Sequence, residues 1–583
     1  MRFRLADWTG DGEFDILEAR WNAVVWEQVG RSGSRRVFKC RDWIGKDQLQ
    51  GHTCCPTVVD FDGNGILDGV ISAEDGYFYY VRNLGRVKPK RVTMLASGWD
   101  VRAAKPKDLL DHAADFDKSG FDGVLLLLED TRKLPTSPEW KADKFDHHLD
   151  TIRAFAAHKG LKETLLQCQF SPEKRISWFD RAAWARFAHN AGVLAAFAKR
   201  AGLKGLSDDN EDYPHSNQWF YDPEKDVVTY NEVCLMARQY GEQVGKAMFD
   251  AYPDMVFMSA WHLSGDHSYF KSPDPAGKMR DAGDLWPAFV EGLVQACPPT
   301  GRLVDGNESG YNADAESNDY YVQSWNIKQA ALGLLKPENR AKYLATLSVS
   351  FGIYTDRCVN TNTASCWYFP PGADGTRISR FAVNITQAAR VAEDYLWVYG
   401  EKGLVVPWIR DTKRFRDYKT WEELLPGFTA AIRAQTDPEG LATEALAASS
   451  ANLLPRKPFT WQHPKRVQGK FETKDGAWTA IGVESGCYIL ETPALAGHLY
   501  AVGGEIRGNG NVAITWKRKG KLMGQTPGGV LEMAKQVGGG WRRGVGTFCV
   551  PNGADRLVIH LGLARQRADE MTSFRNIRAV EIR

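Results

Sequence analysis

The chain has 583 residues, which is too long for one hydrophobic core, so we expect about two to four domains, one of them large. Hydrophobic residues make up 43% and charged residues 25%, the composition of an ordinary globular protein. A formal net charge of +2 argues against a nucleic-acid or membrane-surface protein, and no apolar run is long enough for a membrane span.

Residues 1 to about 90 contain a repeated acidic motif. The stretches DWTGDGEFD, from Asp7, and DFDGNGILD, from Asp60, align position by position, and each leads into a strand-like segment. Oxygen-bearing side chains fall at loop positions 1, 3, 5 and 9, a spacing that suits Ca²⁺ on a tight turn containing glycine. The predicted calcium ligands are Asp7, Thr9, Asp11 and Asp15 in the first copy and Asp60, Asp62, Asn64 and Asp68 in the second.

The two copies resemble FG-GAP or VCBS repeats, the calcium-binding blades of some β-propellers. The resemblance implies a β-rich, propeller-like segment over residues 1–91 that holds structural Ca²⁺. Two copies are too few to close a propeller, so we expect a small β-rich appendage or a segment cut from a longer secreted protein. Acidic β-turns without metal are the alternative. On this basis we expect a secreted, periplasmic or cell-surface protein whose native signal peptide is missing from the sequence.

From residue 92 to residue 452, strand-like segments alternate with long amphipathic helical patterns. Eight strands with intervening helices predict a (β/α)8 TIM barrel. The predicted strands are Thr93–Asp100, Phe121–Leu128, Glu163–Gln169, Leu203–Asp209, Met255–Trp261, Arg302–Asp305, Leu347–Thr355 and Tyr395–Tyr399. The predicted helices include Lys144–His158, Asp180–Arg200, Tyr230–Ala251, Leu285–Ala296, Asp319–Leu335 and Ile378–Asp394.

The pattern of predicted elements changes again in the C-terminal part. A proline-spaced linker at 453–467 precedes residues 468–583, where short alternating strands with glycine-rich turns predict an all-β sandwich. Its last strands resemble those of a jelly roll of the carbohydrate-binding-module type. That resemblance implies glycan binding, while a plain structural module remains equally open.

In a (β/α)8 barrel the active site lies at the carboxyl ends of the strands, so the polar residues that follow each strand are the candidates. Acids and aromatic residues follow at least six of the eight predicted strands, which favours an enzyme over a purely structural domain. The predicted substrate contacts are Trp99, Asp100, Trp261, His262, Asp305, Asn307, Tyr311, Asp356, Trp397 and Glu401. Turn-capping for Asp305 and Asn307, and packing for the tryptophans, are the alternatives.

The acidic run that begins at Asp208 is the centre of the predicted site. Period-two alternation places Asp209 and Glu211 on one side of the fourth strand, and Glu308 follows the sixth strand. Retaining glycosidases hold two carboxyls about 5–5.5 Å apart, and inverting ones about 6.5–9.5 Å apart. We predict that Glu211 and Glu308 form the catalytic pair, with Asp209 as a helper.

Residues 95–435 resemble (β/α)8 glycoside hydrolases of bacterial polysaccharide degraders. The resemblance implies hydrolysis of a poly- or oligosaccharide without a catalytic cofactor. A strand-4 and a strand-6 acid resemble the placement in barrel α-glycosidases, where the strand-4 residue is the nucleophile. Asn210-Glu211 also resembles the acid/base motif of many β-glycosidases, but the chain lacks their strand-7 glutamate. Asp209 with Glu211 resembles chitinase-like enzymes, in which the acetamido group of the substrate attacks.

A non-catalytic carbohydrate-binding protein on the same scaffold is the alternative from another functional class. The sequence gives neither the sugar and its linkage nor the oligomeric state.

Overall fold

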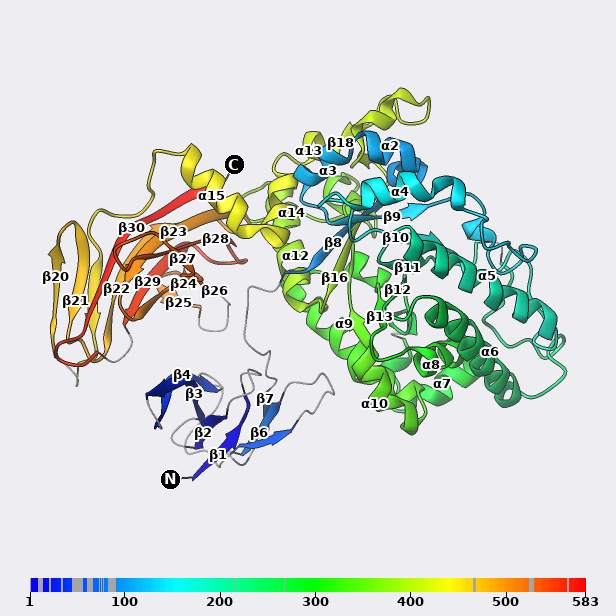
Figure 1. Cartoon of the computed structure of the whole chain (residues 1–583), viewed down its shortest axis with the longest axis horizontal. Helices are drawn as coiled ribbons and strands as arrows, with labels where there is room; N and C mark the ends of the chain where they lie inside the picture. The colour runs from blue at the N-terminus through cyan, green and yellow to red at the C-terminus, as the bar shows by residue number, and fades with distance from the viewer. Residues whose placement is uncertain are drawn as a thin grey trace. The chain divides into compact units, whose positions relative to one another are not determined.

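The computed structural model describes residues 2–8, 14–19, 23–32, 35–44, 56–59, 67–72, 74, 76, 78–81 and 91–582, with gaps at 214, 267, 465–467, 524–528 and 564–565. The chain divides into two compact units, the first comprising Met1–Lys90 with Glu338–Ala345 and the second Arg91–Pro337 with Thr346–Arg583. Figure 1 shows the elements of both. Among the described residues, none of the helices combines the length and the hydrophobicity that a membrane crossing requires.

The first unit contains two small antiparallel sheets. β1 (Arg2–Ala6), β2 (Asp15–Ala19), β3 (Ala23–Ser32) and β4 (Arg35–Ile44) form one, and β5 (Thr57–Val59), β6 (Asp68–Ser72) and β7 (Phe78–Val81) form the other. They share an apolar cluster built on Ala6, Leu17, Val25 and Ile71.

Three of the eight predicted calcium ligands are described. Asp15 and Asp68 are buried, and Asp15 Oδ1 accepts a hydrogen bond from the backbone of Gln28 (3.0 Å), whereas Asp7 is half-buried. The other five, Thr9, Asp11, Asp60, Asp62 and Asn64, lie outside the described residues. Calcium binding therefore stays a prediction.

The second unit is built on a large, curled, parallel sheet of nine strands (Figure 1). Every predicted strand is present. The first five are shorter than predicted, the sixth has the predicted bounds, the seventh is divided in two, and the eighth is one residue longer. In sequence order the strands are β8 (Thr93–Gly98), β9 (Gly123–Leu127), β10 (Leu165–Cys168), β11 (Gly205–Asp208), β12 (Val256–Ser259), β13 (Arg302–Asp305), β14 (Leu347–Val349), β15 (Gly352–Tyr354) and β16 (Tyr395–Gly400).

The order across this sheet is β14-β13-β12-β11-β10-β9-β8-β16-β15. β14 and β15 lie at opposite ends of the hydrogen-bonded path, yet only Ser350 and Phe351 separate them in the chain. Ser350 N donates to Asp305 O (2.9 Å) and Trp397 N donates to Phe351 O (3.2 Å), so this dipeptide bonds to β13 and to β16, the strand next to each end of the path.

Helices alternate with these strands, as predicted from the 3.6-residue periodicity. Side-chain caps set several of their starts: Asp180 accepts from Ala183 N before α5, and Thr229 forms a capping box with Glu232 before α6. The helices of the sheet region are α1 (Trp99–Ala103), α2 (Pro106–Asp111), α3 (Ala113–Ser119), α4 (Leu149–Ala156), α5 (Arg181–Arg200), α6 (Tyr230–Ala251), α7 (Pro275–Ala282), α8 (Trp286–Ala296), α9 (Asp319–Lys328), α11 (Asp356–Val359) and α12 (Arg377–Val391). Most of α10 (Pro337–Thr346) belongs to the first unit.

Residues 459–582 form two six-stranded antiparallel sheets around one apolar core that includes Tyr488, Trp516 and Phe574. β19 lies within the segment predicted as a linker, so the sheets begin earlier than expected. The first sheet contains β19 (Phe459–Gln462), β22 (Gly486–Pro493), β24 (Gly510–Arg518), β25 (Lys521–Leu522), β26 (Gly529–Val530) and β29 (Arg556–Leu563). The second contains β20 (Lys470–Lys474), β21 (Ala477–Ile481), β23 (Leu499–Arg507), β27 (Lys535–Gln536), β28 (Arg542–Cys549) and β30 (Met571–Ile582).

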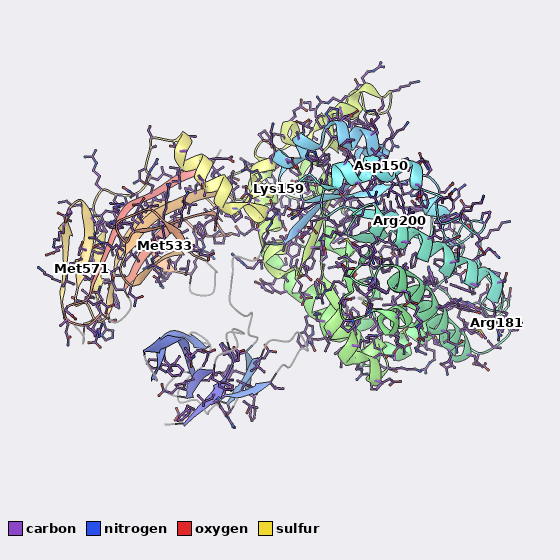
Figure 2. All side chains as sticks on the ribbon, viewed as in Figure 1. Asp150, Lys159, Arg181, Arg200, Met533 and Met571 are labelled. Atoms are coloured by element: carbon purple, nitrogen blue, oxygen red, sulfur yellow. The ribbon has the colours of Figure 1, made fainter. Side chains whose placement is uncertain are left out.

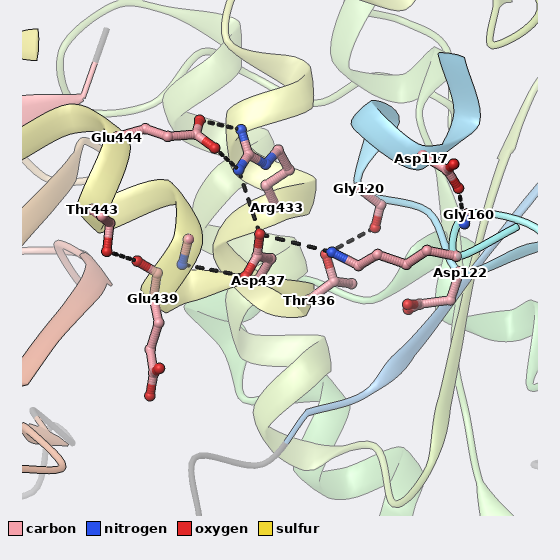
Figure 3. A network of polar contacts seen from close by, with 12 residues as sticks. Asp117, Gly120, Asp122, Gly160, Arg433, Thr436, Asp437, Glu439, Thr443 and Glu444 are labelled. Atoms are coloured by element: carbon pink, nitrogen blue, oxygen red, sulfur yellow. Dashed lines mark hydrogen bonds and ion pairs between the residues drawn. The ribbon is translucent and has the colours of Figure 1, made fainter. Parts of the chain in front are cut away.

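Two short elements, β17 (Gly403–Leu404) and β18 (Lys419–Thr420), and three helices, α13 (Trp421–Leu424), α14 (Phe428–Thr436) and α15 (Pro438–Ala448), connect the parallel sheet to the antiparallel sheets. Arg433 on α14 binds both carboxylate oxygens of Glu444 on α15 (2.7 and 2.8 Å), and Thr436 Oγ1 donates to Gly120 O (2.8 Å; Figure 3). On its other side α15 packs Ala442 and Leu446 against Ala501 and Val580.

Candidate active site

Three carboxylates, Asp209, Glu211 and Glu308, share the carboxyl-terminal edge of the parallel sheet, and we refer to them as the carboxylate cluster. Asp209 and Glu211 follow β11, and Glu308 opens the 3-10 helix η5 (Glu308–Asn312) after β13. Backbone bonds fix the turn before Glu308, because Gly306 N donates to Ser259 O (2.8 Å) and Glu308 N donates to Ala260 O (2.9 Å).

The carboxylate groups interact through their charges. Burial, together with the negative charges of Glu211 and Asp209, raises the pKa of Glu308 to about 8, while a hydrogen bond from the Tyr311 hydroxyl acts in the opposite direction. Burial also raises the pKa of Glu211, against a hydrogen bond from the Tyr213 hydroxyl. With a pKa of about 8, Glu308 is protonated at neutral pH.

Asp209 is buried and held by cationic and amide donors. Its Oδ2 accepts from Arg102 Nη2 (3.0 Å) and Gln167 Nε2 (3.4 Å), and Arg132 Nη2 lies 3.7 Å away. Arg102 comes from α1, directly after β8, and its guanidinium also lies over the Tyr399 ring, 5.5 Å from the centroid. Arg102, which follows the first predicted strand, therefore contacts residues at the ends of the fourth strand (Asp209) and the eighth strand (Tyr399).

Aromatic rings pack beside Glu308. Tyr311 stacks on Tyr354 (centroids 5.0 Å apart) and on Tyr399 (5.8 Å), and Trp367 meets Tyr354 edge to face (5.3 Å). Trp367 is 38% exposed, whereas Tyr311 is buried. We refer to Tyr311, Tyr354, Trp367 and Tyr399 as the aromatic wall, because planar rings of this kind can lie against the apolar faces of sugar rings.

Several predicted substrate contacts are buried and form hydrogen bonds within the protein itself. Asp100 Oδ2 accepts from Val405 N (2.6 Å) and Val406 N (2.9 Å), and burial raises the pKa of Asp100 to about 6. Asp356 accepts from the backbone N–H groups of Glu401 (2.7 Å) and Lys402 (3.0 Å). Both acids tie the loop after β16 in place.

Two residues at or just after the end of β13 are also buried and bound within the protein. Asp305 accepts from Leu263 N, Ser264 N, Ser264 Oγ and Asn307 N, the contacts that a turn residue would make. Asn307 donates to Gln323 Oε1 (2.8 Å) from a buried position in the left-handed region, with φ 44°.

His262 and Trp397 are also buried. The His262 ring packs against Phe257, and burial lowers its pKa, while Trp397 Nε1 donates to Gly306 O (2.7 Å). These two residues therefore support the turns that carry the cluster.

The remaining predicted contacts keep accessible positions. Trp99 is 36% exposed and lies under the Arg414 guanidinium, and Trp261 is half-buried. Glu401 accepts from the Tyr399 hydroxyl (3.2 Å), which links it to the aromatic wall.

Sequence reasoning missed Arg102, Arg132 and Tyr213. Arg102 lies only two residues after Asp100, so the strand-end rule that selected Trp99 and Asp100 could have found it. Arg132 lies in a long loop after β9, and no spacing in the sequence connects it with Asp209.

No protein-family model matches the sequence, and no curated protein matches it. Among solved structures, the chain is similar to an exo-beta-1,4-mannosidase, Op5Man5, from Opitutaceae bacterium strain TAV5 (14% identity, 65% of this chain, 62% of that chain, TM-score 0.32). It is also similar to a protein described as a glycoside hydrolase (12% identity, 87% and 96%, TM-score 0.30) and to a GH18 chitinase from Pseudoalteromonas aurantia (13% identity, 54% and 97%, TM-score 0.28). At these TM-scores the likenesses assign neither a fold family nor an activity.

Proposed function

We propose that this chain is a glycoside hydrolase in which Glu308 is the general acid and Glu211 is the nucleophile or general base. The observation that carries the proposal is the pKa of Glu308, raised to about 8 beside two further carboxylates. When their surroundings give two neighbouring carboxyls different pKa values, one can be a proton donor while the other is charged at the same pH. Purely structural carboxylates, such as Asp305, are instead saturated by backbone donors.

In this proposal Glu308 protonates the glycosidic oxygen as the bond to the anomeric carbon breaks. The Glu211 carboxylate attacks that carbon, or removes a proton from the water that attacks it. Arg102 positions Asp209, and the negative charge of Asp209 helps to keep Glu308 protonated. The stereochemical outcome, read by NMR of the first product anomer, distinguishes the two roles of Glu211.

The substrate-assisted mechanism is the weaker alternative. It requires a strand-4 aspartate that can bind the acetamido group of the substrate, but Asp209 Oδ2 is already bound by Arg102 and Gln167.

We further propose that the catalytic domain is a closed (β/α)8 barrel. β14 and β15 would be two halves of the seventh strand, separated at Ser350 and Phe351, because they pair with β13 and β16 respectively. The two antiparallel sheets of residues 459–582 would form the jelly roll expected from the sequence.

The test of function is turnover of a panel of poly- and oligosaccharides, followed as released reducing ends. The wild-type chain should cleave at least one of them, and Glu211→Gln and Glu308→Gln should bind that glycan without cleaving it. Binding without turnover by the wild-type chain would instead support a carbohydrate-binding protein.

A further inference from the structure

A second group of polar side chains lies in the long loop that follows β9. Glu129 stands two residues after the end of β9, and His147 and His148 belong to the 3-10 helix η2 (Asp146–His148). One potential ligand atom from each of the three residues lies within 4.8 Å of the other two. His148 Nε2 lies 3.1 Å from Glu129 Oε2, and the two imidazole centroids are 4.0 Å apart.

The geometry fits a small transition-metal ion. Zn²⁺ bonds to imidazole nitrogen and carboxylate oxygen are about 2.0–2.2 Å long, so neighbouring ligand atoms of a tetrahedral site lie about 3.3 Å apart. The Glu129–His148 separation of 3.1 Å is close to this value, and the ligand atom of His147 lies within 4.8 Å of the other two. Two nitrogen donors favour zinc over Ca²⁺ or Mg²⁺, which prefer oxygen ligands.

Ion pairs outside the cluster hold both of its segments. Arg200, at the end of α5, binds the two carboxylate oxygens of Asp146 and donates to Ala142 O (3.1 Å); Figure 2 labels Arg200. Lys144 Nζ donates to Asp130 Oδ2 (2.7 Å), and so connects the segment of the histidines to the residue after Glu129. Asp130 has a left-handed backbone with φ 66°, a conformation unusual for a non-glycine residue. The backbone segments that carry the three side chains are therefore connected to the rest of the fold, and to each other, by these ion pairs.

We propose that Glu129, His147 and His148 form a zinc site with a fourth position open to water. The site is separate from the carboxylate cluster, but the two share a loop, because Arg132, three residues after Glu129, reaches Asp209 (3.7 Å). A zinc ion would fix the start and the end of this loop to each other.

The experiment titrates ZnCl₂ into the untagged, chelator-treated full chain and follows binding by calorimetry. One Zn²⁺ should bind per chain with a Kd of about 1 µM or tighter. His147→Ala and His148→Ala should each remove that binding step. His147 is the decisive position, because a simple Glu129–His148 hydrogen bond does not need it.

His158→Ala is the matched control. His158 Nδ1 forms a similar pair with Asp117 (3.0 Å), but that pair is not part of any three-residue metal-binding group among the described residues. Its removal should leave zinc binding unchanged. Thermal unfolding profiles of the variants, recorded without metal, establish that each one is folded.

Two outcomes would overturn the proposal. One is the absence of stoichiometric zinc binding by the wild-type chain, and the other is binding by His147→Ala with wild-type affinity.

Discussion

Glu308 is a carboxyl whose environment differs strongly from that of an ordinary surface carboxyl. Because its pKa is raised to about 8, it is protonated at neutral pH and loses its proton as the pH rises through about 8. Activity that depends on the acid should therefore decline above about pH 8. A pH profile of kcat/KM on the cleaved glycan measures this decline, the alkaline limb of the profile. A profile that stays flat to pH 10 would exclude Glu308 as the acid.

Glu308→Gln removes the proton donor but keeps the size of the side chain. We expect kcat to fall by about 10²–10⁴-fold, the usual contribution of a general acid. Glu439→Gln, an exposed residue on α15, is the control and should keep wild-type turnover. Equal activities of the two variants would contradict the assignment.

Removing the Tyr311 hydroxyl tests whether the aromatic wall influences the pKa of Glu308. Its hydrogen bond favours the charged form of Glu308 and lowers the pKa of that group. Tyr311→Phe should raise the pKa of Glu308 by about one unit, and thus move the alkaline limb of the pH profile upward. Tyr320→Phe removes another buried hydroxyl, whose partner is Asn384 (3.5 Å), and should leave the limb in place.

At the scale of elements, the turns after the strands depend on buried carboxylates. Asp305 accepts four hydrogen bonds from the turns after β12 and β13. Asp305→Ala should destabilise the fold by about 3 kcal/mol or more, because buried N–H groups lose their partner. Urea unfolding followed by tryptophan fluorescence measures the change.

Asp150→Ala is the control for this substitution. The Asp150 side chain is 99% exposed on α4 (Figure 2), and its replacement should change the free energy of unfolding by less than about 0.5 kcal/mol. A similarly small effect of Asp305→Ala would show that the turn does not need its carboxylate.

At the scale of the whole molecule, a histidine connects the antiparallel sheets to the loop before α12. His498 Nε2 lies 2.9 Å from Asp374 Oδ2, and its Nδ1 lies 2.6 Å from Glu581 Oε1. These two carboxylates raise the pKa of His498 despite its partial burial, which acts in the opposite direction. Hydrogen bonds from Ser379, Thr376 and His498 outweigh burial and lower the pKa of Asp374 to about 2.

The pKa shifts of His498 and Asp374 make the stability of this junction depend on pH in opposite directions. The His498 contribution to stability is fully present below its unfolded pKa of about 6.5, and it is lost as the pH rises through the higher folded value. The Asp374 contribution is present above about pH 3.8 and is lost as the pH falls through about 2. The junction should therefore be most stable between about pH 4 and 6.5.

Calorimetric melting between pH 5 and 9 checks the histidine side of this prediction. The wild-type melting temperature should decrease across the interval, while His498→Gln should remove most of that decrease and Glu581→Gln only part of it. A wild-type profile parallel to that of His498→Gln would contradict the contribution of His498.

The sequence by itself determined the strands and helices of the large unit. Apolar runs such as Leu203–Asp209 and capped helices such as Tyr230–Ala251 carry their signals in neighbouring residues, so periodicity and capping chemistry are enough to locate them. The strand-end rule also selected Glu211, Glu308 and Asp209, because polar residues after buried strands are visible in the chain.

Only the tertiary structure decided which polar residues remain available for chemistry. Asp100, Asp305 and Asp356 have the same sequence signature as Glu308, but each of them accepts hydrogen bonds from backbone N–H groups of distant segments. Arg102 reaches Asp209 across 107 positions of the chain, and no local pattern encodes such a contact. Burial, charge coupling and hydrogen-bond saturation depend on long-range packing, and for that reason they separate the proposed acid from the structural acids only after the chain has folded.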